Sequence, residues 1–180
     1  MKTLRIWPVL LGPALIMSFA SVSQGQESTQ EDFKEFCQVL KGRFTAKITW
    51  VIDWEPFAKK GDKTTAYWEA RLAEDDHLLI GKCFIGKGSD TAFMFYDPGS
   101  RQIKTVWVDT DGGTGESVTF KEANKWVQFW DYTKPDGRKV KMSCTLTVTD
   151  NGNTHTWHRI GQNEKGAFEA TELWYRASGK

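Results

Sequence analysis

The chain of 180 residues is almost neutral, with 24 Lys and Arg residues against 23 Asp and Glu residues scattered along it. A nucleic-acid or anionic-membrane partner requires a concentrated basic surface, so this charge pattern argues against both classes. Hydrophobic residues make up 39% of the chain and include nine tryptophans, enough to build a substantial core.

Residues 1–25 have the pattern of a secretory leader. Lys2 and Arg5 precede an apolar run at 6–20, and a small, polar stretch follows at 21–25. The run is broken by prolines and is shorter than the roughly 20 residues that a membrane-spanning helix needs. We therefore expect a cleaved signal peptide, export to the bacterial periplasm or the medium, and no membrane span after cleavage.

Removing the leader leaves residues 26–180, a length typical of one domain. The charge then becomes 22 basic against 23 acidic residues, since Lys2 and Arg5 are lost. No internal repeat, low-complexity tract or linker divides the stretch 43–176. The sequence predicts a single domain of unknown oligomeric state.

A short helix is expected directly after the leader. Residues 28–30 can cap its start, and Gly42 can end it after about Leu40. Its apolar residues recur at i, i+3, i+4 and i+7, which predicts one apolar stripe that must pack on another element. The stripe consists of Phe33, Phe36, Cys37 and Leu40.

From Arg43 onward the apolar period changes from helical to two, which is typical of half-buried strands. The first strand alternates from 43 to 53, with Ile48, Trp50 and Ile52 on its apolar face. Further strands are expected at 63–73, 78–85, 91–96, 103–109, 116–121, 126–132, 139–149, 154–160 and 168–176.

The connectors between these strands are short and rich in Gly, Pro, Asn and Asp. Short links place consecutive strands side by side, and a long antiparallel meander closes because closure removes its edges. The sequence therefore predicts an all-β fold: a single antiparallel meander closed into a roughly ten-stranded barrel, with the short N-terminal helix over one end.

The dipeptide Asn151-Gly152 between two β-rich runs predicts a two-residue type I′ turn, closed by Asp150 and Asn153. Such a turn determines which residues face each other across the hairpin. The facing pairs on the apolar side are expected to be Val148 with His155, Leu146 with Trp157, and Cys144 with Arg159. His158 is expected to point outward, opposite Thr145.

Both ends of the barrel region resemble calycins, the superfamily of lipocalins, fatty-acid-binding proteins and nitrobindin-like proteins. Leu40-x-Gly42-x-Phe44 is similar to their opening Gly-x-Trp motif, with Phe in place of Trp, and the closing Leu-Trp-Tyr-Arg at 173–176 resembles their last strand. The resemblance implies that Phe44 and Arg176 form a barrel-closing cation–π contact, worth roughly 1 kcal/mol.

Four internal segments resemble more closely an uncharacterised family of bacterial exported lipocalin-like proteins. They lie at 96–98, 102–105, 109–113 and 147–152. This resemblance implies a calycin-like barrel and exported location, and it implies no particular activity.

Alternation along the strands predicts an aromatic interior that carries a few polar groups. The predicted interior site residues are Trp50, Trp68, His155, Trp157, Arg159, Glu172 and Trp174. Aromatic walls with few polar groups are typical of small-molecule sites. The alternative is a filled barrel in which Glu172 neutralises Arg159 or Arg176. The inward face of 91–96 stays open, because that run is apolar on both faces.

The sequence offers weaker candidates for chemistry. His155 could ligate haem, as the nitrobindin resemblance implies, or pair with Glu172 as acid and base, although a lone His on an apolar face is more often a core residue. Asp109-x-Asp111 lacks the remaining ligands of a calcium loop, and no metal site or catalytic residue is expected.

The three cysteines of the predicted mature chain are Cys37, Cys83 and Cys144. A bridge between Cys83 and Cys144 would suit an oxidising compartment, whereas burial of all three as free thiols is the other interpretation.

The leading hypothesis is an exported barrel that binds a small apolar or amphipathic molecule, without a cofactor. The alternatives are a filled barrel that acts as a protein-interaction or envelope module, and a barrel enzyme or haem protein that uses His155.

Overall fold

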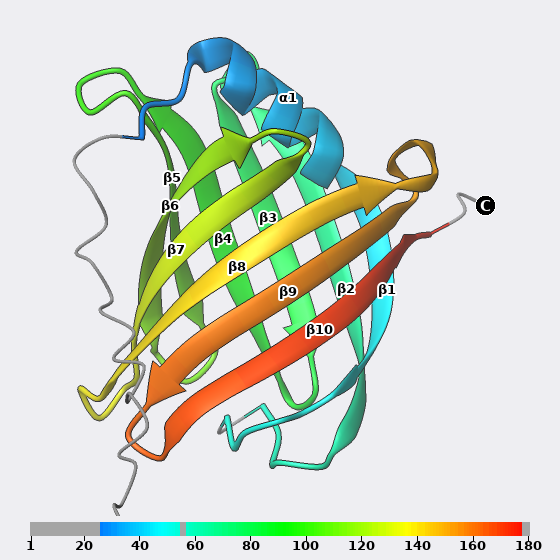
Figure 1. Cartoon of the computed structure of the whole chain (residues 1–180), viewed down its shortest axis with the longest axis vertical. Coiled ribbons are helices and arrows are strands. Elements are labelled where there is room, and N and C mark those ends of the chain that lie inside the picture. Colours follow the sequence, from blue (N-terminus) through cyan, green and yellow to red (C-terminus); the bar gives the residue numbers. More distant parts are fainter. Residues whose placement is uncertain (1–25, 55–56, 178–180) are drawn as a thin grey trace, which may run out of the picture.

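The computed structural model describes residues 26–54 and 57–177. The expected leader at 1–25 lies outside the described residues. Ten strands form a single antiparallel meander that closes into a barrel, and one helix lies across an end of it (Figure 1). The elements are α1 (Gln30–Leu40), β1 (Gly42–Thr49), β2 (Lys63–Ala73), β3 (Leu78–Ile85), β4 (Gly88–Asp97), β5 (Gln102–Asp109), β6 (Thr114–Glu122), β7 (Lys125–Thr133), β8 (Lys139–Thr149), the 3₁₀ turn η1 (Asp150–Gly152), β9 (Thr154–Asn163) and β10 (Gly166–Arg176).

The all-β barrel architecture is therefore confirmed. Every strand pairs with its neighbours in sequence, and β1 pairs with β10 to close the sheet. The closing ladder is short: Phe44 lies opposite Arg176, and Ala46 lies opposite Trp174. The guanidinium of Arg176 lies 4.4 Å from the centre of the Phe44 ring, which is the expected cation–π contact.

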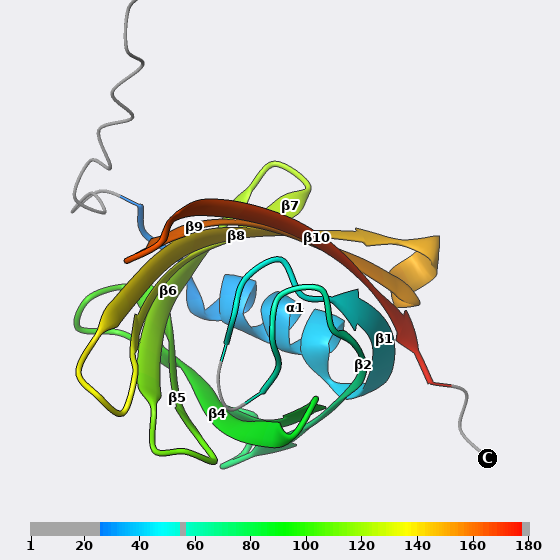
Figure 2. The same cartoon turned by 90° about the horizontal axis from the view of Figure 1, so that it is seen from below.

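Helix α1 begins with a capping box, in which Thr29 and Asp32 satisfy each other's backbone N–H groups. Its predicted stripe, Phe33, Phe36, Cys37 and Leu40, is buried in the barrel end. The indole of Trp68 also donates to the Leu40 carbonyl oxygen over 2.9 Å, which ties the helix end to β2. Viewed from the opposite end, α1 lies behind the connection between β1 and β2 (Figure 2).

The β8–β9 hairpin has the predicted register, with Val148 opposite His155 and Cys144 opposite Arg159. Asn151 and Gly152 have φ angles of 51° and 87°, and the N–H of Asn153 donates to the carbonyl oxygen of Asp150, as in a type I′ turn. The predicted closing pair was wrong, because Asp150 also adopts a positive φ. The strand ladder therefore ends one pair earlier, at Thr149 and Thr154.

The predicted first strand was too long. It ends at Thr49, so Trp50 and Ile52 belong to the connection that bends over the open barrel end. Within this connection Trp50 pairs its backbone with Asp62 and Gly61, and Trp54 pairs with Ala58. Local backbone hydrogen bonds replace the strand ladder there, and apolar side chains at both odd and even positions turn toward the interior.

Other strand ends differ by smaller amounts. β4 begins at Gly88 rather than at 91, and β9 continues to Asn163 rather than ending at 160. The earlier start of β4 brings Asp90 into the sheet.

The three cysteines Cys37, Cys83 and Cys144 are free thiols, so the bridge between Cys83 and Cys144 is not formed. Among the described residues, no helix is both long enough and apolar enough to cross a membrane.

The packing of α1 predicts a large stability effect at Phe36, which is fully buried 5.0 Å from the Trp126 ring centre. Phe36→Ala should lower the free energy of unfolding by about 3–5 kcal/mol, because it removes buried apolar surface and leaves a cavity. Urea unfolding measures this loss. Phe84→Ala is the matched control, since Phe84 is 50% exposed on β3, and it should cost less than about 1 kcal/mol. If both variants lost the same free energy of unfolding, the packing of α1 into the barrel end would be contradicted.

Candidate functional site

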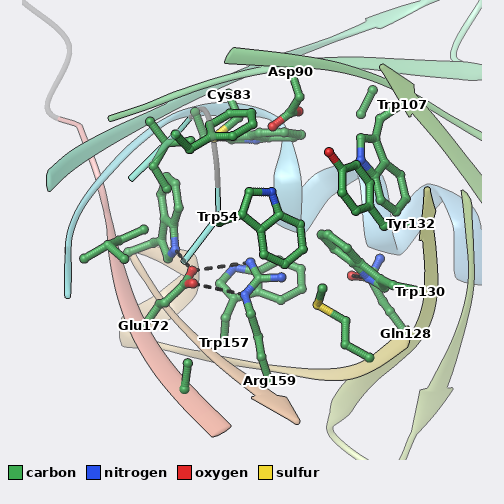
Figure 3. Close-up of a pocket in the computed structure, with 18 of the residues that line it drawn as sticks. Trp54, Cys83, Asp90, Trp107, Gln128, Trp130, Tyr132, Trp157, Arg159 and Glu172 are labelled. Atoms are coloured by element: carbon green, nitrogen blue, oxygen red, sulfur yellow. Dashed lines mark hydrogen bonds and ion pairs between the residues drawn. The ribbon is translucent and has the colours of Figure 1, made fainter. Parts of the chain in front are cut away.

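The barrel contains a partly open cavity of about 240 Å³ between α1 and the β1–β2 connection. Its walls are mainly aromatic, and seven of the nine tryptophans line it (Figure 3). These seven are Trp50, Trp54, Trp68, Trp107, Trp130, Trp157 and Trp174. The indoles therefore enclose a volume that they do not fill.

Every interior residue predicted from the sequence lies on the cavity wall. The structure places there Trp50, Trp68, His155, Trp157, Arg159, Glu172 and Trp174. Phe44 also lines the cavity, whereas Arg176 covers the Phe44 ring at the closed end. The predicted residues thus come together around one space, although Trp50 reaches it from the connection rather than from β1.

Sequence reasoning missed the opposite side of the cavity. The lining residues it left unassigned include Trp54, Asp90, Trp107, Asp109, Gln128, Trp130 and Tyr132. Alternation along 103–109 would have placed Trp107 and Asp109 on one face with the buried Ile103. Asp90 had no such signal, because it precedes the predicted strand and the run after it is apolar on both faces.

Glycines on neighbouring strands allow two indoles to lie flat against the barrel wall. A Cβ atom at Gly115 would lie 2.0 Å from the Trp107 ring, and one at Gly81 would lie 2.1 Å from the Trp68 ring. Both distances are too short for any side chain, so glycine is required at these positions if the rings are to stay against the wall.

Arg159 and Glu172 form an ion pair on one side of the cavity, with guanidinium-to-carboxylate distances of 3.1 and 3.3 Å. The Arg159 guanidinium also lies over the rings of Trp130 and Trp157, at 4.9 and 5.3 Å. Glu172 accepts a third hydrogen bond from the Trp174 indole. Burial alone would lower the pKa of Arg159, but Glu172 and Cys144 hold it above its ordinary value. The positive charge of Arg159 is therefore retained and is paired with Glu172.

A second polar group lies across the cavity. Asp90 on β4 faces Asp109 on β5, and Tyr132 donates a 2.7 Å hydrogen bond to Asp109. Burial, and then the charge of Asp109, raise the pKa of Asp90 to about 7. Burial and the neighbouring Asp111 raise the pKa of Asp109 to about 6, against the opposing effect of Tyr132.

His155 lies at the closed end, stacked on the Phe44 ring at a centroid distance of 4.2 Å. Burial, and then the charge of Arg176, lower the pKa of His155 to about 4, so the imidazole is neutral at physiological pH. Its Nε2 atom has no hydrogen-bond partner among the described residues.

The haem alternative has little support in this geometry. A cavity of about 240 Å³ is small for a porphyrin of four pyrroles, since ~150 Å³ already holds a single benzene ring. His155 stacks on Phe44 as a neutral ring. Within residues 26–54 and 57–177, no group of three His, Cys, Asp or Glu side chains is placed to hold a metal ion.

The two thiols near the cavity are poorly suited to act as nucleophiles. Burial raises the pKa of Cys144 to about 11 and raises that of Cys83 further above its ordinary range. Both thiols are therefore protonated at neutral pH, and the protonated form is a weak nucleophile.

No protein-family model matches this chain, and no curated protein matches its sequence.

The raised pKa of Asp90 predicts a pH-dependent change in stability. The folded state binds this proton more tightly than the unfolded state, so the contribution of Asp90 is fully present below about pH 4 and is lost as the pH rises through 7. Asp90→Asn removes the ionisable group, so the variant does not lose this stability as the pH rises. Between pH 4 and pH 8 the variant should gain roughly 3 kcal/mol relative to the unmodified protein. Urea unfolding at both pH values measures the difference.

Asp131→Asn is the matched control for this experiment. Asp131 lies on β7, about half exposed, and pairs with Lys141 at 2.9 Å. The same substitution there should produce no comparable gain between the two pH values. The effect of His155, which has the opposite sign, is common to all three proteins and cancels in the comparison. A constant difference between Asp90→Asn and the unmodified protein would show that Asp90 is ionised freely in the cavity.

Proposed function

We propose that this protein is an exported barrel that binds a small, largely apolar molecule inside its cavity. The observation that carries the proposal is the cavity of about 240 Å³, whose walls include seven indoles. Ligand sites are concave and mostly apolar, with a few placed polar groups. The Arg159–Glu172 pair and the Asp90–Asp109 pair supply such groups.

A calycin-type barrel is part of the same proposal. The closed ten-strand meander, the helix across one end and the Arg176 contact on Phe44 are consistent with that superfamily. In a barrel of this kind the closed end is built for stability, and the opposite end admits the ligand. Here the β1–β2 connection lies at the opposite end, where Trp54 contacts the cavity.

A barrel filled by its own side chains is less well supported. Such an interior would be packed at the density of a protein core, without a void that holds more than a few waters. The observed cavity exceeds the ~150 Å³ that accommodates benzene.

Native mass spectrometry of the protein purified from the exported fraction of its own cells tests the proposal directly. We expect a mass excess that disappears on denaturation. The same spectrum gives the mass of the polypeptide, which should lack residues 1–25. Retention of those residues would contradict a cleaved leader independently of the ligand.

Filling the cavity should abolish binding. Ala170 lines the cavity from β10, so Ala170→Phe places a ring in the space. The substitution should lower the affinity for a neutral one-ring probe, 2-phenylethanol, at least tenfold. Calorimetric titration measures this affinity.

Ala167→Phe is the matched control, because Ala167 is exposed on the same strand and should leave the affinity unchanged. Circular dichroism checks that both variants are folded. Absence of saturable binding to the unmodified protein, together with a bare mass in the native spectrum, would contradict a binding role.

A further inference from the structure

One wall of the cavity carries four oxygen-bearing side chains that lack cationic partners within the described part of the chain. We call this set the acidic wall. It consists of Asp90 on β4, Thr105 and Asp109 on β5, and Ser117 on β6. The strand register brings them together, since Asp90 lies opposite Asp109 and Thr105 lies opposite Ser117.

Three of the four side chains of the acidic wall are buried and carry unpaired polar atoms, whereas Asp90 is partly exposed. Thr105, Asp109 and Ser117 are only 5–8% exposed. Among the described residues, the hydroxyl oxygens of Thr105 and Ser117 and the Oδ1 atom of Asp109 have no hydrogen-bond partner. Buried polar atoms are almost always paired, so three orphans on one cavity wall indicate a missing donor.

The cation that lines the cavity, Arg159, is already engaged. Arg159 stands on β9, and four strands separate β9 from β4 in either direction around the barrel, so Arg159 and Asp90 lie across the cavity from each other. Figure 3 shows them on opposite sides of Trp54, with Arg159 joined to Glu172. Arg159 therefore offers no free charge to an anionic ligand.

The remaining charged or titratable groups around the wall do not neutralise it. Lys82 on β3 donates to the Thr91 hydroxyl, whose residue alternates with the inward-facing Asp90 and Ala92. Tyr132 on β7 donates only to Asp109. Lys82 and Arg159 each lower the pKa of Asp90, but burial and the charge of Asp109 outweigh them and the pKa stays raised. Asp111 in the β5–β6 turn acts on Asp109 and is acidic. Cys83 on β3 and Glu172 on β10 also line the cavity, and neither is cationic.

Aromatic faces adjoin the acidic wall. Trp107 lies between Thr105 and Asp109 on the inward face of β5, and its ring is parallel to that of Tyr132 at 6.5 Å. Trp54 packs on Tyr132 at 5.1 Å from the β1–β2 connection. Aromatic faces attract cations, and they also stack on the rings of a ligand.

We propose that the cavity selects a small organic cation, a protonated amine attached to one or two rings, with its ammonium group against Asp90 and Asp109 and its rings among Trp54, Trp107 and Tyr132. This inference rests on the proposed binding function. An ammonium group provides three donors, which match the carboxylate and hydroxyl acceptors of the acidic wall. A cavity of about 240 Å³ suits a ligand of this size.

Three probes of similar shape test the charge preference by calorimetric titration at pH 7.5: 2-phenylethylamine as the cation, 2-phenylethanol as the neutral molecule and 3-phenylpropanoate as the anion. The amine should bind at least tenfold more tightly than the alcohol, and the anion should bind most weakly. The affinity of the amine should fall as the pH is lowered from 8 to 5, because Asp90 and Asp109 become protonated. The affinity of the alcohol should not change.

Asp90→Asn should lower the affinity for the amine at least tenfold and change the affinity for the alcohol less than twofold. Asp131→Asn, on the outer surface of β7, should change neither affinity. Binding of the alcohol without preference for the amine, or tightest binding of the anion, would overturn the cation selectivity while leaving the binding function intact. Binding of none of the three probes would overturn the cation selectivity, and together with a bare mass in the native spectrum it would overturn the binding function as well. The comparison of the three probes on the unmodified protein tests the cation selectivity even if a variant fails to fold.

Discussion

The interior of this protein exists because the first and last strands meet. The ladder between β1 and β10 is the shortest in the barrel, and side-chain contacts reinforce it. Arg176 covers the Phe44 ring, and its guanidinium also donates to the backbone oxygens of Lys41 and Gly152. The Phe44 ring also stacks with His155 of β9. The Arg176 side chain thus links the end of β10 to the start of β1, the β8–β9 turn and the end of the helix.

The closed barrel has a densely packed end and an end that holds the cavity. Near α1 the interior is packed with buried apolar side chains, including Phe33, Phe36, Leu79 and Ile103. Toward the opposite end the lining changes to indoles, an ion pair and two facing carboxyls. Burying carboxyls without a cation opposes folding, so the densely packed end must compensate for the cavity. Strain of this kind is typical of sites retained for function rather than for stability.

The parts of this arrangement that local chemistry determines were predictable. Asn151-Gly152 specifies its own turn, and the register that this turn imposes is enough to assign His155, Trp157 and Arg159 to the interior face. Phe44 and Arg176 carried a recognisable pattern at the two ends of the barrel. The path of the β1–β2 connection was not predictable, because Trp50, Val51 and Ile52 are apolar in succession and continue to look like a strand.

The acidic wall was missed for a different reason, which lies in how strands combine. Asp90 and Asp109 stand 19 positions apart in the sequence. Asp90 directly precedes one predicted strand and Asp109 ends another, and neither local pattern indicates that the two residues meet. Only the register of β4 against β5 makes them neighbours, and only closure of the barrel turns that pair toward Arg159 across the cavity. The resulting charge asymmetry, with a neutralised cation on one side and uncompensated carboxyls on the other, is a property of the closed barrel. This asymmetry favours the proposed orientation of a cationic ligand, because the other side of the cavity offers a positive charge only Glu172, already bound to Arg159 and Trp174.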